Sequence, residues 1–332
     1  MSSIPSIPLS PALIAGDSSP PPTRHTFQFN GEGWSFFTLM LKHIFLNIIT
    51  LGIYLPWAKS EKRSYLWQNI EIAGAPLRYH GTGKELFWGY VKVVAAWLGY
   101  VGLITATATF SPFAGLITQF VLGFAIIAVI PGIILGSRAY LLTRTSWRGV
   151  FFGVENAKLF SDFTKLWLEG YLVTLFTFGL YAPVWNNRIY SYLTNNTLYG
   201  DTSLEYLGDT YKVTGIFFRS LPLILLTGGL YYFWYAAKLW KYQLSVTYFQ
   251  NATGKFDITG SQLLWLFLVQ VLGTTLTLGL ALPWVSTYTF SFIMQRISFE
   301  GEIDFTTINQ GSQTIEGAAD SFADVLDIGI GL

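Results

Sequence analysis

Four long apolar segments of this chain end in the tripeptide Thr-x-Gly, and a short aromatic-rich segment follows each of them. The four tripeptides occupy residues 50–52, 177–179, 227–229 and 277–279. After three of them a proline comes within a few residues, and proline ends a helix because it lacks an N–H and clashes with the preceding turn. The recurrence predicts an internal repeat built on apolar helices that stop at Thr-x-Gly.

The composition of the chain is typical of a membrane protein. Of its 332 residues, 52% are hydrophobic and only 12% are charged, whereas soluble domains carry about 25% charged residues. Crossing a bilayer takes ~20 apolar residues. The predicted fold class is therefore membrane all-α with about six transmembrane helices. The predicted spans are residues 34–56, 86–109, 113–135, 166–186, 214–236 and 262–285.

Short β-strands are predicted beside these spans, at the membrane interface. Alternating apolar and polar residues next to a Gly or Asn turn are the signature of strands and hairpins. The chain is divided into a disordered N-terminal tail (1–24), a repeat-built polytopic membrane domain (25–310) and an acidic C-terminal tail (311–332). The predicted strands occupy residues 27–31, 70–74, 198–200, 248–251 and 297–301.

The distribution of Lys and Arg predicts an orientation in the membrane. Residues 57–85, 136–165 and 237–261 together hold 13 of them, and the segments assigned to the other side hold four. Because cytoplasmic loops are enriched in Lys and Arg, the three basic segments are predicted in the cytoplasm and both termini in the periplasm. If each repeat crosses the membrane once, alternate repeats are inverted, which is a plan found in many transporters.

Several short motifs carry a family resemblance. Residues 50–59 read TLGIYLPWAK, and residues 320–327 form an acidic end, DSFADVLD. These motifs resemble the YjgN-like family of bacterial inner-membrane proteins over most of residues 25–332. The resemblance implies a multi-pass protein of the bacterial inner membrane, and it does not indicate any particular activity. The other residues that match are Phe29, Gly31, Phe36, Phe37, Tyr65, Asn69 and Gly74.

Polar residues recur on one helical face of each repeat, ahead of the glycine. This spacing of four, three and four residues places them on one side of a helix, so the polar faces are predicted to meet inside the bundle. Two interpretations stay open: hydrogen bonds that hold helices together, or the lining of a path for a small polar solute or ion. His43, with Lys42 beside it, is a functional candidate of this polar seam, because ionisable residues within a span are costly. If the helix begins later than Trp34, both residues instead lie near the interface and extend their charged ends into it. The seam comprises His43, Asn47, Thr50, Tyr54, Thr174, Thr177, Tyr181, Ser220, Thr227, Tyr231, Gln270, Thr274 and Thr277.

The sequence excludes several kinds of chemistry. Without cysteine there are no disulfides, thiolate nucleophiles or Cys-ligated metals. The zinc-protease, phosphate-loop, dinucleotide-binding and serine-hydrolase motifs are also missing. No catalytic residue, metal site or cofactor is predicted, and the chain is not expected to be an enzyme. Its net charge of +1 lacks the basic excess that is typical of nucleic-acid-binding proteins.

Two functional hypotheses remain, and both take the lipid bilayer as a partner. The first is a transporter or channel-like protein for a small polar solute, motivated by the polar seam. The second is a membrane scaffold or assembly partner without a transported solute, motivated by the β segments and the acidic tail. Substituting the seam threonines tests the first hypothesis, and deleting residues 313–332 while following a protein partner tests the second.

Overall fold

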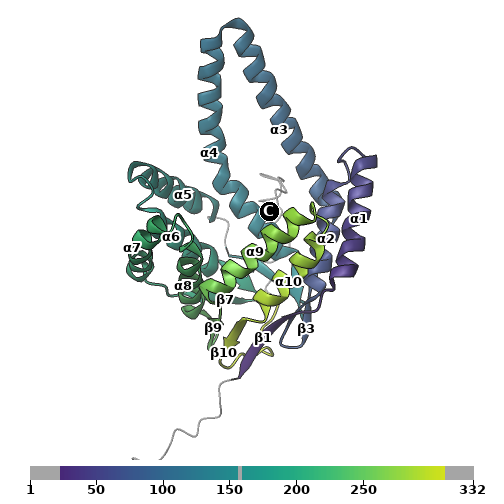
Figure 1. Cartoon of the computed structure of the whole chain (residues 1–332), viewed down its shortest axis with the longest axis vertical. Helices are drawn as coiled ribbons and strands as arrows, with labels where there is room; N and C mark the ends of the chain where they lie inside the picture. Colours follow the sequence, from purple (N-terminus) through teal and green to yellow (C-terminus); the bar gives the residue numbers. More distant parts are fainter. Residues whose placement is uncertain (1–22, 156–158, 311–332) are drawn as a thin grey trace, which may run out of the picture.

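The computed structural model describes residues 23–155 and 159–310. In this part of the chain, ten strands and ten helices follow one another in the order strand, helix, helix, strand, repeated five times (Figure 1). The strands are β1 (Arg24–Phe29), β2 (Ile70–Ile72), β3 (Ala75–Tyr79), β4 (Thr145–Trp147), β5 (Val150–Val154), β6 (Thr197–Tyr199), β7 (Thr202–Tyr206), β8 (Thr247–Phe249), β9 (Ala252–Phe256) and β10 (Ile297–Glu300). The helices are α1 (Gly33–Ile49), α2 (Leu55–Gln68), α3 (Gly83–Phe110), α4 (Pro112–Thr143), α5 (Leu159–Phe176), α6 (Ala182–Asn195), α7 (Thr210–Leu226), α8 (Tyr232–Ser245), α9 (Gly260–Leu276) and α10 (Leu282–Met294).

The strands form one closed antiparallel barrel. Each strand pairs with its neighbours in sequence, and β1 pairs with β10 through His25 opposite Phe299. Strands β2 and β3, β4 and β5, β6 and β7, and β8 and β9 are joined by two-residue turns, whereas the other sequential pairs are joined by two helices. Because neighbouring strands are antiparallel, the two kinds of connection lie at opposite ends of the barrel. All helical hairpins therefore leave from one end, and the described chain begins and finishes at the other.

The barrel interior is apolar and closed at its turn end. Trp147, Tyr199 and Phe249 are buried there on three different strands, since alternate side chains of a strand point to the same face. The segment after β10 covers them, with the Phe305 ring 5.0 Å from that of Trp147 and Ile308 buried in the same cluster. These side chains surround an apolar cavity of about 210 Å³ at the turn end.

The helices form a closed ring above the barrel, here called the helix ring. Each helix packs against the next one in sequence, and α10 packs against α1. Helices α3 and α4 are longer than the others and project well beyond the rest of the ring (Figure 1). The exposed surface of the helices is rich in large apolar side chains, including Leu41, Phe45, Ile48 and Phe120.

Each Thr-x-Gly tripeptide is a chain reversal that joins two antiparallel helices. At the first one, the Thr50 hydroxyl donates to the Leu46 carbonyl (2.7 Å) and accepts from the Tyr54 amide (3.1 Å). Gly52 has φ +88° and its amide donates to the Asn47 carbonyl (2.8 Å). The left-handed glycine turns the chain back, and the threonine connects the end of one helix to the start of the next.

The predicted fold class is wrong: the chain is not a bundle of about six transmembrane helices. Among the described residues, two helices, α3 and α4, are long and apolar enough to cross a membrane. These two correspond to the predicted spans at 86–109 and 113–135. The other four predicted spans each contain one helix, a Thr-x-Gly reversal and the start of a second helix. A reversal and a helix stop use the same residues, which is why the sequence alone predicts a single crossing.

The predicted short strands exist, but they belong to the barrel and are not separate hairpins at a membrane interface. The predicted pattern of inverted repeats also fails, because every helical hairpin leaves the barrel from the same end. Of the predicted tails, residues 1–22 and 311–332 lie outside the described residues.

The left-handed glycine of the reversal gives a stability test. In Gly179→Ala the new Cβ meets no atom within 4 Å, but the residue keeps φ +87°, which costs about 1–2 kcal/mol for a residue with a side chain. We expect a lower thermal unfolding midpoint in detergent. The control is Gly215→Ala inside α7, where the Cβ is equally unobstructed and alanine is favoured by about 1 kcal/mol. Equal midpoints for the two variants would contradict this account of the reversal.

Candidate functional site

A cluster of ionisable side chains connects the two helices of the α1–α2 hairpin. Lys42 and His43 come from α1, Glu61 comes from α2, and Tyr54 lies at the reversal between them. The Lys42 ammonium donates to Glu61 Oε2 (2.7 Å), and His43 Nε2 lies 3.1 Å from the same oxygen. The Tyr54 hydroxyl donates to Glu61 Oε1 (2.7 Å). Three partners therefore converge on one carboxylate.

The environment of Glu61 favours its charged form. Burial alone would raise its pKa, but the hydrogen bonds from Lys42, Tyr54 and His43 outweigh that effect and lower the pKa to about 2. A carboxylate that accepts several hydrogen bonds behaves in this way. The Lys42 pKa is raised in return by its hydrogen bond to Glu61. This cluster holds a fixed negative charge that is matched by Lys42.

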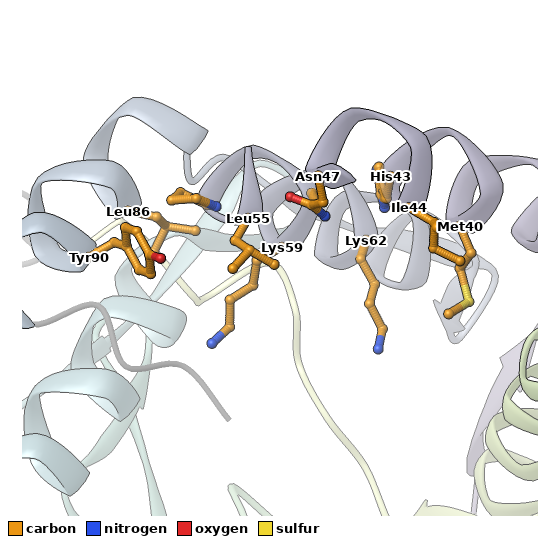
Figure 2. A pocket seen from close by; sticks show the side chains of 11 residues that line it. Met40, His43, Ile44, Asn47, Leu55, Lys59, Lys62, Leu86 and Tyr90 are labelled. Atoms are coloured by element: carbon orange, nitrogen blue, oxygen red, sulfur yellow. The ribbon is translucent and has the colours of Figure 1, made fainter. Parts of the chain in front are cut away.

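A cavity of about 490 Å³ lies beside this cluster, between α1, α2 and the beginning of α3. Its wall is largely apolar. Two lysines of α2, Lys59 and Lys62, also line it, and Figure 2 shows both side chains extending from the helix in the same direction. The full lining comprises Met40, His43, Ile44, Asn47, Leu55, Pro56, Ala58, Lys59, Lys62, Leu86 and Tyr90.

The cavity has an excess of positive charge. Burial, together with the neighbouring cations Arg63 and Lys62, lowers the pKa of Lys59 to about 8. Arg63 is itself buried and donates to the Tyr79 hydroxyl (3.4 Å). In the described part of the chain, neither Lys59 nor Lys62 forms an ion pair with a carboxylate. The Asn47 Oδ1 atom at the cavity wall is also buried without a protein partner.

The threonines of the polar seam act locally. Thr50, Thr177, Thr227 and Thr277 each accept a hydrogen bond from the amide four residues later and donate back into their own helix. Their hydroxyls thus bridge the two helices of one hairpin and do not reach from one hairpin to the next. These contacts are of the first predicted kind, hydrogen bonds that hold helices together, although they act within a hairpin.

Other seam residues have more varied surroundings. His43 and Tyr54 meet at Glu61, and Asn47 lines the cavity. Ser220 is buried in α7, and the hydroxyl of Thr174 is buried without a protein partner. Gln270 and Thr274 lie on α9, in a different hairpin from the cavity.

The seam tyrosines share one contact that the sequence analysis missed. Tyr181 accepts from Arg188 (3.1 Å) and Tyr231 from Lys238 (2.9 Å), seven residues later in each case. Tyr54 and Glu61 have the same spacing, with a carboxylate in place of the cation. Two turns of helix bring residues seven apart onto one face, so this spacing is the signal that identifies Glu61. Lys59 and Lys62 gave no comparable signal.

Comparisons with known proteins place the chain in a family. It belongs to the family described as "Bacterial protein of unknown function (DUF898)", which matches residues 24–233 and 219–325. The predicted resemblance to the YjgN-like family is confirmed by this match and by relatives that are named YjgN. No solved structure matches the chain.

Three relatives share the name "Inner membrane protein YjgN". The protein from Salmonella typhimurium is 24% identical over 382 residues, covering 89% of this chain and 93% of the relative. The protein from Escherichia coli O157:H7 is 35% identical over 25% of this chain and 21% of the relative. That from Escherichia coli K12 is 43% identical over 19% and 16%. None of the three is named as an enzyme.

The Glu61 cluster predicts a specific pH dependence of stability. A carboxyl whose pKa is lowered on folding adds stability above its ordinary pKa of 4.5, and this stability is lost as the pH falls toward 2. We expect Glu61→Gln to lower the thermal midpoint at pH 7 and to differ little from the parent protein near pH 2. Glu205→Gln, on an exposed position of β7, is the control and should follow the parent at each pH. A difference for Glu61→Gln that is constant with pH would rule out the ionic role.

Proposed function

We propose that this protein resides in the bacterial inner membrane and binds a small anion, or the anionic headgroup of a lipid, in the cavity between α1, α2 and α3. The observation that carries the proposal is the pair Lys59 and Lys62, which line an apolar-walled cavity without a carboxylate partner in the described residues (Figure 2). The location is supported by the names of the relatives and by the two membrane-length helices.

The chemistry of the cavity favours a phosphate or carboxylate group attached to an apolar body. Bringing unpaired ammonium groups together in a partly buried site is costly, and an anion between them would remove that cost. Lysine binds phosphate as a point charge, and basic pockets between membrane helices bind anionic lipid headgroups. Met40, Ile44 and Leu86 offer apolar contacts for the remainder of such a ligand.

We further propose that the protein transports the small polar solute that binds in this cavity. It is supported by His43 and Asn47, two residues of the polar seam that border the same cavity. The barrel axis is not part of the proposed path, because apolar side chains such as Trp147, Tyr199 and Phe305 line its turn end. The β segments no longer support the scaffold hypothesis, since strands in a closed barrel offer no free edge to a protein partner.

The test measures ligand binding to the full-length protein in detergent. We expect phosphatidylglycerol, inorganic phosphate or both to raise the thermal midpoint, because the ligand binds only the folded state. Lys59→Gln/Lys62→Gln should weaken binding at least tenfold, given that charged hydrogen bonds contribute about 1.5–3 kcal/mol. The control is Lys84→Gln, an exposed lysine at the start of α3 outside the cavity lining.

The arms of this experiment separate the two sources of the anion. Stabilisation by inorganic phosphate alone identifies a soluble anion, and stabilisation only by the phospholipid identifies a headgroup. If neither stabilises the protein, or if Lys84→Gln weakens binding as much as the cavity variant, the proposed site is wrong.

A further inference from the structure

The short helical hairpins carry charge-free segments centred on their reversals. No Asp, Glu, Lys or Arg occurs between Glu169 and Arg188, between Arg219 and Lys238, or across residues 258–295. In the α1–α2 hairpin the corresponding segment, residues 43–60, contains Lys59 as its single charged residue, and that side chain lines the cavity. The outer parts of these four hairpins therefore present almost no ionic groups.

The lengths of the charge-free segments match the dimensions of a bilayer. In α1–α2, α5–α6 and α7–α8 each arm from charged residue to reversal is roughly eight residues, or about 12 Å of helix, close to the ~15 Å of hydrocarbon in one leaflet. In α9–α10 the charge-free segment extends over both helices, whose 17 and 13 residues give roughly 26 and 20 Å, less than the ~30 Å of the whole hydrocarbon core. The α3–α4 hairpin is free of charge over residues 93–137. Its arms are roughly 22 residues, or about 33 Å, which matches the ~30 Å of the whole hydrocarbon core.

The tips of the short hairpins expose bulky apolar side chains. Phe178 is 97% exposed, Leu278 94% and Leu51 92%. Each sits in the left-handed region, with φ of 51–52°, which is unfavourable for such residues. A polar residue such as Asn tolerates this conformation better, and so apolar side chains at three tips indicate an apolar environment.

The backbone of each reversal is also suited to hydrocarbon, where an unpaired N–H costs several kcal/mol. From residue 51 to residue 55 every amide has an acceptor, and the Thr50 hydroxyl supplies the one for Tyr54. The same holds at 178–182, 228–232 and 278–282. The threonine thus allows a tight turn to enter lipid without leaving a donor unpaired.

We propose that α1–α2, α5–α6, α7–α8 and α9–α10 enter one leaflet of the bilayer as re-entrant hairpins, and that α3–α4 crosses both leaflets. The partner of the exposed apolar surface is the acyl-chain region of the membrane. Because all hairpins leave the same end of the barrel, the barrel and both ends of the described chain lie on one side.

The charge distribution assigns that side. All 20 Lys and Arg residues lie outside residues 93–137, so the turn between α3 and α4 has none. Cytoplasmic segments carry the excess of Lys and Arg, which places the barrel in the cytoplasm and Phe110 at the periplasmic face. This orientation is the reverse of the periplasmic termini predicted from the sequence, because re-entrant hairpins return the chain to the side from which it entered.

The lack of cysteine in the chain makes single-cysteine labelling a clean test. The full-length protein would carry Ser203→Cys on the barrel, Phe110→Cys at the α3–α4 turn, or Phe178→Cys or Leu278→Cys at reversals. Each position is exposed, so the fold should persist, and unchanged thermal midpoints check it. A membrane-impermeant maleimide is applied to spheroplasts and to inverted membrane vesicles.

Ser203→Cys should react only in inverted vesicles and Phe110→Cys only in spheroplasts. Phe178→Cys and Leu278→Cys should react in neither, and should become reactive in detergent. Reaction of the reversal positions in inverted vesicles would show that the tips lie in water, and reaction in spheroplasts would show that those hairpins cross the membrane. Reaction of Ser203→Cys in spheroplasts would overturn the orientation. Each of these three results contradicts the proposal.

Discussion

The hydrogen bond from the amide four residues later to a threonine hydroxyl is the contact on which the architecture depends. A sharp turn between two helices leaves donors at the start of the second helix without partners. At each Thr-x-Gly site the hydroxyl accepts one of these donors, and the left-handed glycine sends the chain back. The connection is therefore short, and the amides of the turn find their acceptors within the hairpin.

This reversal decides the topology of the barrel. A single helix between two strands would bring the chain to the far end of that helix, whereas a helical hairpin returns it to the barrel rim. The chain can then enter the adjacent antiparallel strand, as β1 does through α1 and α2 into β2. Repeating this connection around the barrel closes the helix ring above it, with α10 against α1.

Local features of the sequence predicted local structure well. The strands that begin near residues 70, 198, 248 and 297, the helical stop at each Thr-x-Gly, and the two long helices at 86–109 and 113–135 are all present. The number of crossings could not be predicted in this way, because a Gly followed by Pro marks the end of one helix and equally the start of another. The sequence did not predict strands β3, β4, β5, β7 and β9, which complete the barrel.

The site was only partly predictable, for a similar reason. His43 and Tyr54 were identified by their position on a polar face, but their shared partner Glu61 lies on the returning helix, which was not expected to fold back beside α1. Lys59 and Lys62 could not be identified for the same reason, because the sequence predicts a cytoplasmic loop for residues 57–85 whereas these lysines lie on a helix that forms one wall of a cavity.

The α1–α2 hairpin differs from α5–α6 and α7–α8 in the sign of its internal charge. Seven residues after the tyrosine, α6 and α8 carry Arg188 and Lys238, whereas α2 carries Glu61. Glu61 is occupied by Lys42, His43 and Tyr54, so it cannot also neutralise the lysines on the cavity side of α2. The carboxylate therefore stabilises the hairpin while leaving Lys59 and Lys62 without a protein anion, which is the condition that a ligand anion would satisfy.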